Sequence, residues 1–263
     1  MILTLPGFIQ VLDRMNTYIY KSGGTRFPHH GNGSKNEIII ASTNNLMSMV
    51  KVLSHENSLV SKFIAELRDT TIQQDRLRFR RNLERIGEIA AYEISKVLSY
   101  QSKDFVTPLG VSKMKVPSQE PVVATILRAG LPLHQGILNY FDNADNAFIS
   151  AYRKHHKDGS FDISLEYVAS PDLTGRTVIL VDPMLATGQS MVMTYKAMLE
   201  KGVPAHTHIV SIIASAQGVE YVKKHLSENI TLWVGAVDEE LTAQSYIVPG
   251  LGDAGDLAYG KKS

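Results

Sequence analysis

The feature that most constrains the fold is an alternation of short apolar runs with helical segments between residues 121 and 237. The run 177–181, Thr-Val-Ile-Leu-Val, is continuously apolar after its first residue and rich in β-branched side chains, which is typical of a strand buried on both faces. The segment 190–201 suits a helix that is ended by Gly202 and Pro204. Strands that alternate with helices predict an α/β fold with a mostly parallel central sheet and helices on both of its faces.

The same patterns give the expected element boundaries. Strands are expected at 121–127, 146–152, 161–167, 177–181, 208–214 and 230–237, and helices at 58–68, 73–98, 131–141, 190–201 and 217–226. The helix 73–98 has one apolar stripe, made by Phe79, Leu83, Ile86, Ala90, Ile94 and Val97. Five arginines lie beside that stripe, at positions 76, 78, 80, 81 and 85. Binding of nucleotide or RNA is one interpretation, but a solvated face or a subunit contact fits the near-neutral chain better.

The charge balance and the cysteine count narrow the class of protein. Lys plus Arg is 27 and Asp plus Glu is 26, so no excess charge attracts nucleic acid or anionic lipid. The absence of cysteine excludes disulfides, thiolate metal sites and cysteine nucleophiles. No apolar run reaches the roughly 18–20 residues that cross a bilayer. We therefore expect a cytoplasmic protein without nucleic-acid or membrane partners.

Residues 1–48 differ from the rest of the chain. Gly23-Gly24 and the run 29–34, His-His-Gly-Asn-Gly-Ser, favour irregular structure over a helix or strand. We expect 1–48 to be a disordered or non-native extension and 49–263 to form one domain. A native N-terminal arm is the alternative.

One strand–loop–helix segment offers both a sugar contact and a phosphate cradle. The buried strand ends at Asp182, whose carboxylate can accept hydrogen bonds from sugar hydroxyls. Gly188 allows the backbone to approach a phosphate closely. The hydroxyls of Thr187 and Ser190 and the free N–H groups at the helix start converge on an anion. Together these groups suit a ribose 5-phosphate.

This segment resembles a known signature. Asp-Pro-Met-Leu-Ala-Thr-Gly at 182–188 resembles the phosphoribosyl pyrophosphate (PRPP) signature of type I phosphoribosyltransferases, and in this form resembles the uracil phosphoribosyltransferase family. The chain departs from the pattern at two positions. Pro183 stands where most type I enzymes have a second acidic residue, and Gln189 stands where the family usually has a second glycine.

Two further segments agree with that resemblance. The segment 246–256, Tyr-Ile-Val-Pro-Gly-Leu-Gly-Asp-Ala-Gly-Asp, is similar to the family's uracil-binding segment, and its glycines and proline would make a rigid turn with exposed main-chain donors and acceptors. The segment 126–131 looks like the family's pyrophosphate loop. Arg153 matches its second PRPP-binding arginine, and 154–159 would be its mobile loop. The resemblance covers about residues 54–260.

The resemblance implies pentosyl transfer in pyrimidine salvage: uracil and PRPP give UMP and pyrophosphate. Mg²⁺ would be held by the pyrophosphate oxygens and not by the protein. The expected catalytic residues are Asp182 and Arg128. The expected PRPP-binding residues are Arg128, Arg153, Asp182, Pro183, Met184, Leu185, Ala186, Thr187, Gly188, Gln189, Ser190 and Asp253, and the expected uracil-binding residues are Ile247, Gly252, Asp253 and Ala254. No general base for uracil N1 is apparent. Members of the family form homodimers or larger homo-oligomers, and some respond to GTP.

Two other functions stay open at this point. One is a phosphoribosyltransferase for another base, because recognition by the backbone encodes specificity poorly. The other is a nucleotide-binding regulator on the same fold, which the intact Asp182 and Arg128 disfavour. Elsewhere, His206 and His208 can face the same side of a strand but lack a nearby third metal ligand, and Trp233 is expected in the core.

Overall fold

The structure is a computed structural model that describes residues 49–155, 161–226 and 229–261, with only the backbone described at 151–155 and 161–165. The strands are β1 (Val50–Val52), β2 (Tyr100–Thr107), β3 (Gly110–Pro117), β4 (Val122–Leu127), β5 (Asp145–His155), β6 (Phe161–Ala169), β7 (Thr177–Val181), β8 (Met184–Leu185), β9 (His206–Ser215), β10 (Ile230–Asp238), β11 (Glu240–Leu241) and β12 (Ile247–Val248). The helices are α3 (Leu59–Arg68), α4 (Arg76–Ser95), α5 (Leu131–Leu138), α6 (Gln189–Met198), α7 (Ala216–His225) and α8 (Ala254–Tyr259), with 3₁₀ turns η1 (Ile72–Gln74) and η2 (Leu199–Lys201). The expected extension, 1–48, lies outside the described residues.

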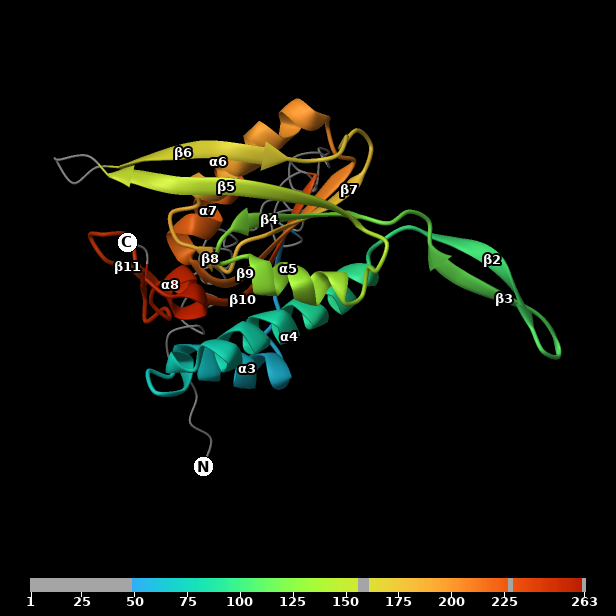
Figure 1. Cartoon of the computed structure of the whole chain (residues 1–263), viewed down its shortest axis with the longest axis horizontal. Helices are drawn as coiled ribbons and strands as arrows, with labels where there is room; N and C mark the ends of the chain where they lie inside the picture. The colour runs from blue at the N-terminus through green and yellow to red at the C-terminus, as the bar shows by residue number, and fades with distance from the viewer. Residues whose placement is uncertain (1–48, 156–160, 227–228, 262–263) are drawn as a thin grey trace, which may run out of the picture. The chain divides into compact units, whose positions relative to one another are not determined.

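A central sheet has the strand order β1-β10-β9-β7-β4-β5-β6 (Figure 1). Every neighbouring pair from β1 to β5 is parallel, and β6 pairs antiparallel with β5. This confirms the predicted α/β fold with a mostly parallel sheet. The carboxyl ends of β4 and β7 therefore lie side by side, and ligand sites of such sheets form at that edge.

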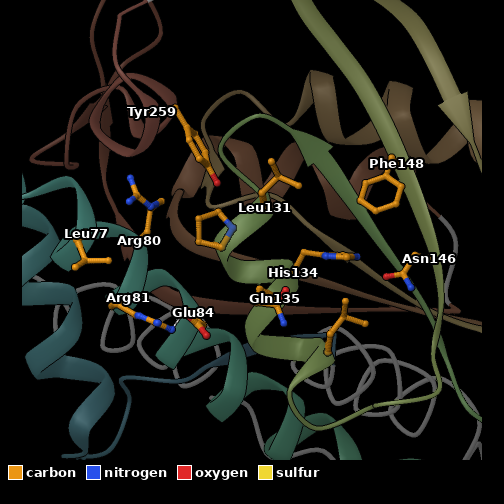
Figure 2. A pocket seen from close by; sticks show the side chains of 12 residues that line it. Leu77, Arg80, Arg81, Glu84, Leu131, His134, Gln135, Asn146, Phe148 and Tyr259 are labelled. Atoms are coloured by element: carbon orange, nitrogen blue, oxygen red, sulfur yellow. Dashed lines mark hydrogen bonds and ion pairs between the residues drawn. The ribbon is translucent and has the colours of Figure 1, made fainter.

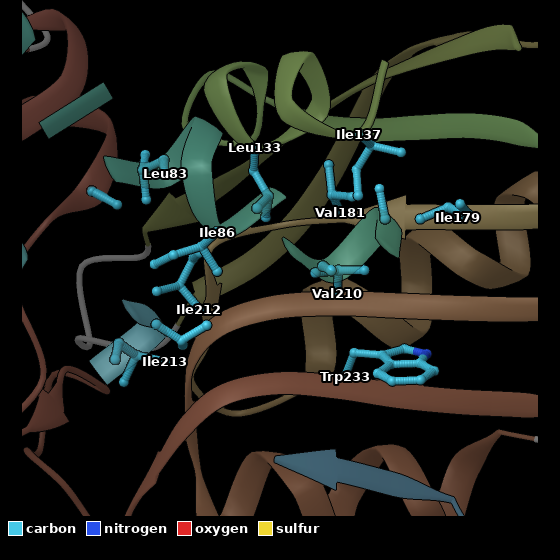
Figure 3. Close-up of a cluster of buried hydrophobic side chains, with 14 of the residues drawn as sticks. Leu83, Ile86, Leu133, Ile137, Ile179, Val181, Val210, Ile212, Ile213 and Trp233 are labelled. Atoms are coloured by element: carbon cyan, nitrogen blue, oxygen red, sulfur yellow. The ribbon is translucent and has the colours of Figure 1, made fainter. Parts of the chain in front are cut away.

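Each face of the sheet has its own hydrophobic cluster, because successive side chains of a strand point to opposite faces. On one face Ile179 and Val181 of β7 pack with residues of α3, α4 and α5 (Figure 3). On the other face Val178 and Leu180 pack with residues of α6 and α7. Trp233 is buried in the first cluster, as predicted.

The long helix α4 is shorter than its sequence pattern predicted. Asp75 ends the preceding 3₁₀ turn and caps α4, since its side chain accepts a hydrogen bond from the backbone N–H of Arg78. The predicted stripe from Phe79 to Ile94 is buried, but Val97 lies beyond the helix and is exposed. Including Val97 in the stripe was therefore wrong.

The arginines of α4 have partners within the chain. Arg78 makes an ion pair with Glu66, and Arg81 makes one with Glu84. Arg80 donates to the carbonyl oxygen of Ala258 at 2.7 Å, which ties α4 to α8. Arg78 and Arg81 are exposed, which agrees with the expected solvated face, whereas Arg80 is partly buried by its contact with α8.

Several elements differ from the expected ones or were not expected. The hairpin β2–β3 had no predicted counterpart and extends away from the sheet in Figure 1. Strand β5 continues to His155, so 154–155 belong to a strand and not to a loop, while 156–160 lie outside the described residues. Tyr167, the last residue of the strand expected at 161–167, is exposed. Within the described ranges, no helix is long and apolar enough to span a membrane.

Candidate active site

Three separate segments of the chain meet around one cleft of about 640 Å³ at the carboxyl ends of β4 and β7. The loop after β4, the loop after β7 and the C-terminal segment each line it. The lining residues are Ile126, Leu127, Arg128, Ala129, Asp182, Met184, Leu185, Ala186, Thr187, Gly188, Ser190, Met191, Gln244, Ser245, Tyr246, Ile247, Gly252, Asp253, Ala254 and Gly255. All of them except Met191, Gln244 and Ser245 belong to the three segments that the sequence singled out, 126–131, 182–190 and 246–256.

Most of the expected site residues lie on this cleft, and two of the described ones, Pro183 and Gln189, do not. The side chain of Arg153 lies outside the described residues, although its backbone belongs to β5. Pro183 is buried away from the cleft, where its carbonyl oxygen accepts hydrogen bonds from the backbone of Ile212 and Ile213, both at 3.0 Å. Gln189 is exposed as the first residue of α6. Pro183 therefore anchors the loop 182–190, here called the phosphate loop, and is not a lining residue.

The phosphate loop is held rigidly against β9 and α7. Ser215 donates its hydroxyl to the carbonyl oxygen of Ala186 at 2.5 Å, and the same hydroxyl accepts from the backbone N–H of Gly218, which caps α7. Gly188 is the N-cap residue of α6, with φ of +78°. A side chain there would be strained by this φ and would meet the backbone of Gly218. The loop thus presents the first turn of α6 to the cleft, where its N–H groups favour an anion.

Asp182 stands where β7 meets this loop. Its backbone N–H donates to Val210 of β9 at 3.1 Å, which fixes the main chain. One carboxylate oxygen, Oδ1, accepts from the backbone N–H of Met184 at 3.4 Å. The half-buried side chain lies on the wall of the cleft, beside the phosphate loop.

Arg128 connects the pyrophosphate loop to the C-terminal segment. Its Nη2 atom is 3.1 Å from Oδ1 of Asp256, and Nη1 donates to the carbonyl oxygen of Gly260 at 3.3 Å. Both charged side chains are about one-third exposed (36% and 34%), so the ion pair can exchange partners with an incoming anion. Arg128, the residue expected to bind pyrophosphate, is thus paired with the carboxylate of Asp256 in this structure.

The C-terminal segment contributes a turn with unusual backbone conformations. Gly250 has φ of +56° and Gly252 has φ of +93°, both in the region that favours glycine. Ile247 and Ala254 are buried beside the cleft. The side chain of Asp253 caps α8 by accepting from the backbone N–H of Asp256 at 2.9 Å. The cleft therefore receives main-chain groups from a turn whose shape depends on glycine.

Two residues that support this turn had not been expected from the sequence. Arg68, the last residue of α3, makes a two-pronged ion pair with Asp238, the last residue of β10, and both N···O distances are 2.7 Å. Asp238 also accepts from the backbone N–H of Gly250 at 2.9 Å. The pair joins positions 170 residues apart, and no local motif signals such a contact.

A second cavity, of about 600 Å³, lies between α4, α5 and α8. Figure 2 shows Arg80 and Tyr259 at one end of it and Asn146 and Phe148 at the other. His134 lines this cavity as a buried residue, and its burial lowers the pKa of the imidazole. Of the three segments singled out in the sequence, only Leu131, at the end of 126–131, lines this cavity.

The parallel sheet, with a phosphate loop and an arginine at the ends of neighbouring strands, defines a type I phosphoribosyltransferase. Comparison with known proteins narrows this class. The family model for uracil phosphoribosyltransferase matches residues 53–261. The uracil phosphoribosyltransferase of Porphyromonas gingivalis is 58% identical over 210 residues, covering 80% of this chain and 97% of that protein. That of Methanothermobacter thermautotrophicus is 36% identical over 217 residues, covering 82% and 97%.

A solved structure agrees with the sequence relatives. The AQ2163 protein from Aquifex aeolicus superposes with a TM-score of 0.72 at 30% identity, covering 81% of this chain and 98% of that one. The chain belongs to the uracil phosphoribosyltransferase family. This confirms the resemblance that the three sequence segments indicated.

Proposed function

We propose that the cleft catalyses the transfer of the ribose 5-phosphate group of PRPP to uracil, giving UMP and pyrophosphate, as a step of pyrimidine salvage. The observation that carries this proposal is the meeting of three segments at one cleft. They are the phosphate loop (182–190), the pyrophosphate loop with Arg128 (126–131) and the glycine turn (246–256). Each suits a different part of the two substrates. Family membership gives the reaction, and this arrangement supports the proposed place of each substrate.

The roles of the residues follow from their chemistry. The N–H groups of α6 and the hydroxyls of Thr187 and Ser190 hold the 5-phosphate, and Asp182 holds the ribose hydroxyls. Arg128 moves from Asp256 to the pyrophosphate, whose growing charge it stabilises as the bond from C1 to oxygen breaks. The main chain of Ile247, Gly252 and Ala254 orients uracil so that N1 faces C1, where the new bond forms. The chain's contribution is mainly positioning. No described residue is assigned as a base for the N1 proton.

Mg²⁺ is proposed as a partner of the substrate. Among the described residues, no three His, Asp or Glu side chains gather to hold a metal ion. As the family resemblance implies, Mg²⁺ would be held by the pyrophosphate oxygens of PRPP, where it would neutralise charge on the leaving group. Arg128 would meet the same pyrophosphate from the protein side.

The test is UMP formation from uracil and labelled PRPP, with and without Mg²⁺. We expect turnover that depends on Mg²⁺ and prefers uracil over cytosine, because an acceptor built for N3–H is left unpaired by cytosine. A higher rate with orotate or a purine would favour a phosphoribosyltransferase for another base. Ligand binding without turnover of any base would favour a regulator.

A homo-oligomer is proposed from the hairpin β2–β3. Its apolar side chains Val106, Leu109, Val111 and Met114 are between 55% and 100% exposed. An isolated two-stranded hairpin is marginally stable in water, so we propose that a second copy of the chain covers it. Light scattering should give at least twice the mass of one chain for the wild type and a lower mass for Val106→Asp. A monomeric wild type contradicts this.

The GTP effector is proposed to use the second cavity, where Arg80 and Arg81 can meet phosphates and Tyr259 can meet a purine ring. Steady-state rates at low PRPP should change on addition of GTP, and Arg81→Ala should weaken that response. Identical rates with and without GTP would refute it. The cytoplasmic location expected from the sequence stays a prediction.

A further inference from the structure

We propose that the ion pair between Arg68 and Asp238 is a positioning device for base recognition, which holds the glycine turn in the shape that uracil requires. The proposal rests on the proposed function, because it concerns the turn that reads the base. Neither side chain lines the cleft. Any effect of the pair on catalysis must therefore pass through the turn.

The pair holds both polar groups of one residue of the turn. Asp238 Oδ2 accepts from Arg68 Nη1 at 2.7 Å and from the backbone N–H of Gly250 at 2.9 Å. Arg68 Nη1 also donates to the carbonyl oxygen of Gly250 at 3.0 Å. Gly250 is thereby fixed on both its donor and its acceptor by charged groups, which make stronger hydrogen bonds than neutral partners do.

The surroundings make these bonds effective. The carboxylate of Asp238 is buried, with 7% of the residue exposed, and the side chain of Arg68 is 23% exposed. A charge-assisted hydrogen bond is stronger where water is excluded. A buried carboxylate that lost its guanidinium partner would be left with an uncompensated charge. Breaking the pair would therefore be costly, which makes it a firm support for the turn.

The turn has little other regular support. Strand β12, which leads into it, pairs with β11 through only two residue pairs. Gly250 and Gly252 both have positive φ, and because glycine adopts positive and negative φ about equally well, local sterics alone do not hold this shape. Ile247 lies three residues before Gly250 and Gly252 two residues after it, and both line the cleft. Fixing Gly250 thus fixes the main-chain groups on either side that face the base.

The pair also joins the turn to the frame of the fold. Arg68 ends α3, which packs in the first hydrophobic cluster, and Asp238 ends β10 of the central sheet. The phosphate loop is anchored on the neighbouring strand β9. The glycine turn is therefore anchored on β10 and the phosphate loop on β9. Because these strands are neighbours in the sheet, their spacing sets the distance between uracil and ribose C1.

The experiment compares Asp238→Asn and Arg68→Lys with the wild type in steady-state kinetics. Asp238→Asn removes the charge but keeps the size and one acceptor. Arg68→Lys keeps the charge but cannot form the two-pronged contact and the bond to Gly250 together. We expect the KM for uracil to rise by about tenfold or more, the ratio that corresponds to one weakened hydrogen bond to a charged group. The KM for PRPP should change by less than about threefold, and the preference for uracil over cytosine should fall.

The ion pair between Arg78 and Glu66 provides a matched control. It is also two-pronged, with both distances 2.8 Å, and it links α3 to α4 without lining the cleft. Arg78→Lys and Glu66→Gln should lower the melting temperature while leaving the KM for uracil unchanged. A purely structural role for Arg68 and Asp238 would give this same pattern and would overturn the proposal.

Binding measurements separate this inference from the proposed function. Calorimetry of the folded variants should show weaker binding of UMP than in the wild type, with unchanged binding of ribose 5-phosphate. A wild type that forms no UMP and binds UMP no better than ribose 5-phosphate refutes the proposed function. A wild type that turns over uracil, with Asp238→Asn and Arg68→Lys variants whose KM for uracil is unchanged, refutes only the positioning role. If Asp238→Asn does not fold, Arg68→Lys decides between the two results.

Discussion

At the scale of single residues, the role proposed for Asp182 gives the most direct test. Asp182 is the one acidic side chain of the segment 182–190, and it lies on the cleft wall. Asp182→Asn keeps the shape but removes the charge. Because hydrogen bonds to charged groups are worth about 1.5–3 kcal/mol, kcat/KM for PRPP should fall roughly tenfold to a hundredfold. Asp172→Asn is the control. Asp172 Oδ1 accepts hydrogen bonds from the backbone N–H and the hydroxyl of Thr174, ahead of β7, and Asp172 does not line the cleft. Wild-type kinetics for a folded Asp182→Asn would contradict the role.

Gly252 differs from its neighbour Ala254 in what a substitution would change. Its φ of +93° strains any other residue, although the nearest protein atom to an added Cβ is 3.8 Å away, on Leu257. Gly252→Val should lower kcat/KM for uracil roughly a hundredfold, because backbone strain and a branched side chain beside the base act together. Gly252→Ala should be intermediate. Ala254→Gly keeps every main-chain group and should cost less than about threefold. A fully active Gly252→Val would contradict the assignment of this turn to the base.

We expect His208 to make the stability of the fold depend on pH. Burial lowers the pKa of His208 to about 3, and its Nδ1 atom accepts a hydrogen bond from Trp233 Nε1 at 3.2 Å. The unfolded chain binds this proton near pH 6.5, so the neutral ring's contribution to stability is present above that pH. It is lost as the pH falls from 6.5 toward 3, by about 1.4 kcal/mol per pH unit.

Urea unfolding of the wild type and His208→Asn between pH 6.5 and 4.5 measures this contribution. The wild type should lose stability more steeply, by one proton, because Asn keeps an acceptor but does not titrate. Glu66, whose pKa is lowered to about 2 by hydrogen bonds from Arg78 and Asn82, loses its contribution only as the pH falls from about 4.5. Equal slopes for the two proteins in this window would show that His208 does not carry the effect.

At the scale of elements, the strands and helices with a regular apolar pattern could be predicted from the sequence. The buried run of β7 was placed at its observed bounds, and the stripe of α4 was correct up to Ile94. The hairpin β2–β3 was missed because all residues of β2 are exposed, which leaves no apolar alternation to detect. In the site, the two loops after β4 and β7 were found from local motifs. The Arg68–Asp238 pair was not, because tertiary packing alone brings its partners together.

Close packing of α4 on α5 supports the pyrophosphate loop, which precedes α5. Gly87 of α4 and Gly136 of α5 lie where the helix backbones touch, and a Cβ at Gly136 would overlap the carbonyl group of Glu84. Gly136→Ala should therefore force the helices apart and destabilise the fold by about 1–3 kcal/mol, despite the better helix propensity of alanine. Since α5 follows the loop of Arg128, turnover should fall as well. Thermal unfolding and UMP assays check this, with the exposed Gln135→Ala as a control. An unchanged melting temperature would show that the contact can relax.

At the scale of the whole molecule, we propose that the domain begins at Met49 and that residues 1–48 are dispensable for it. The carbonyl oxygen of Met49 accepts from the backbone N–H of Leu232 at 2.7 Å, next to the pairing of β1 with β10. The family match begins at residue 53, and 80% of this chain covers 97% of the relative from P. gingivalis. A chain that begins at Met49 should therefore keep the melting temperature and the UMP-forming rate of the full chain.

A chain that begins at Ser54 is the matched comparison, because it removes only five residues more. It loses β1, whose Val50 and Val52 pack against the second hydrophobic cluster, and it leaves the N–H groups along that side of β10 without strand partners. We expect this chain to melt at least about 5 °C lower, since 1 kcal/mol corresponds to about 2–4 °C in a domain of this size. Calorimetry of the three chains measures the difference. Destabilisation already at Met49 would instead make the first 48 residues a structural part of the fold.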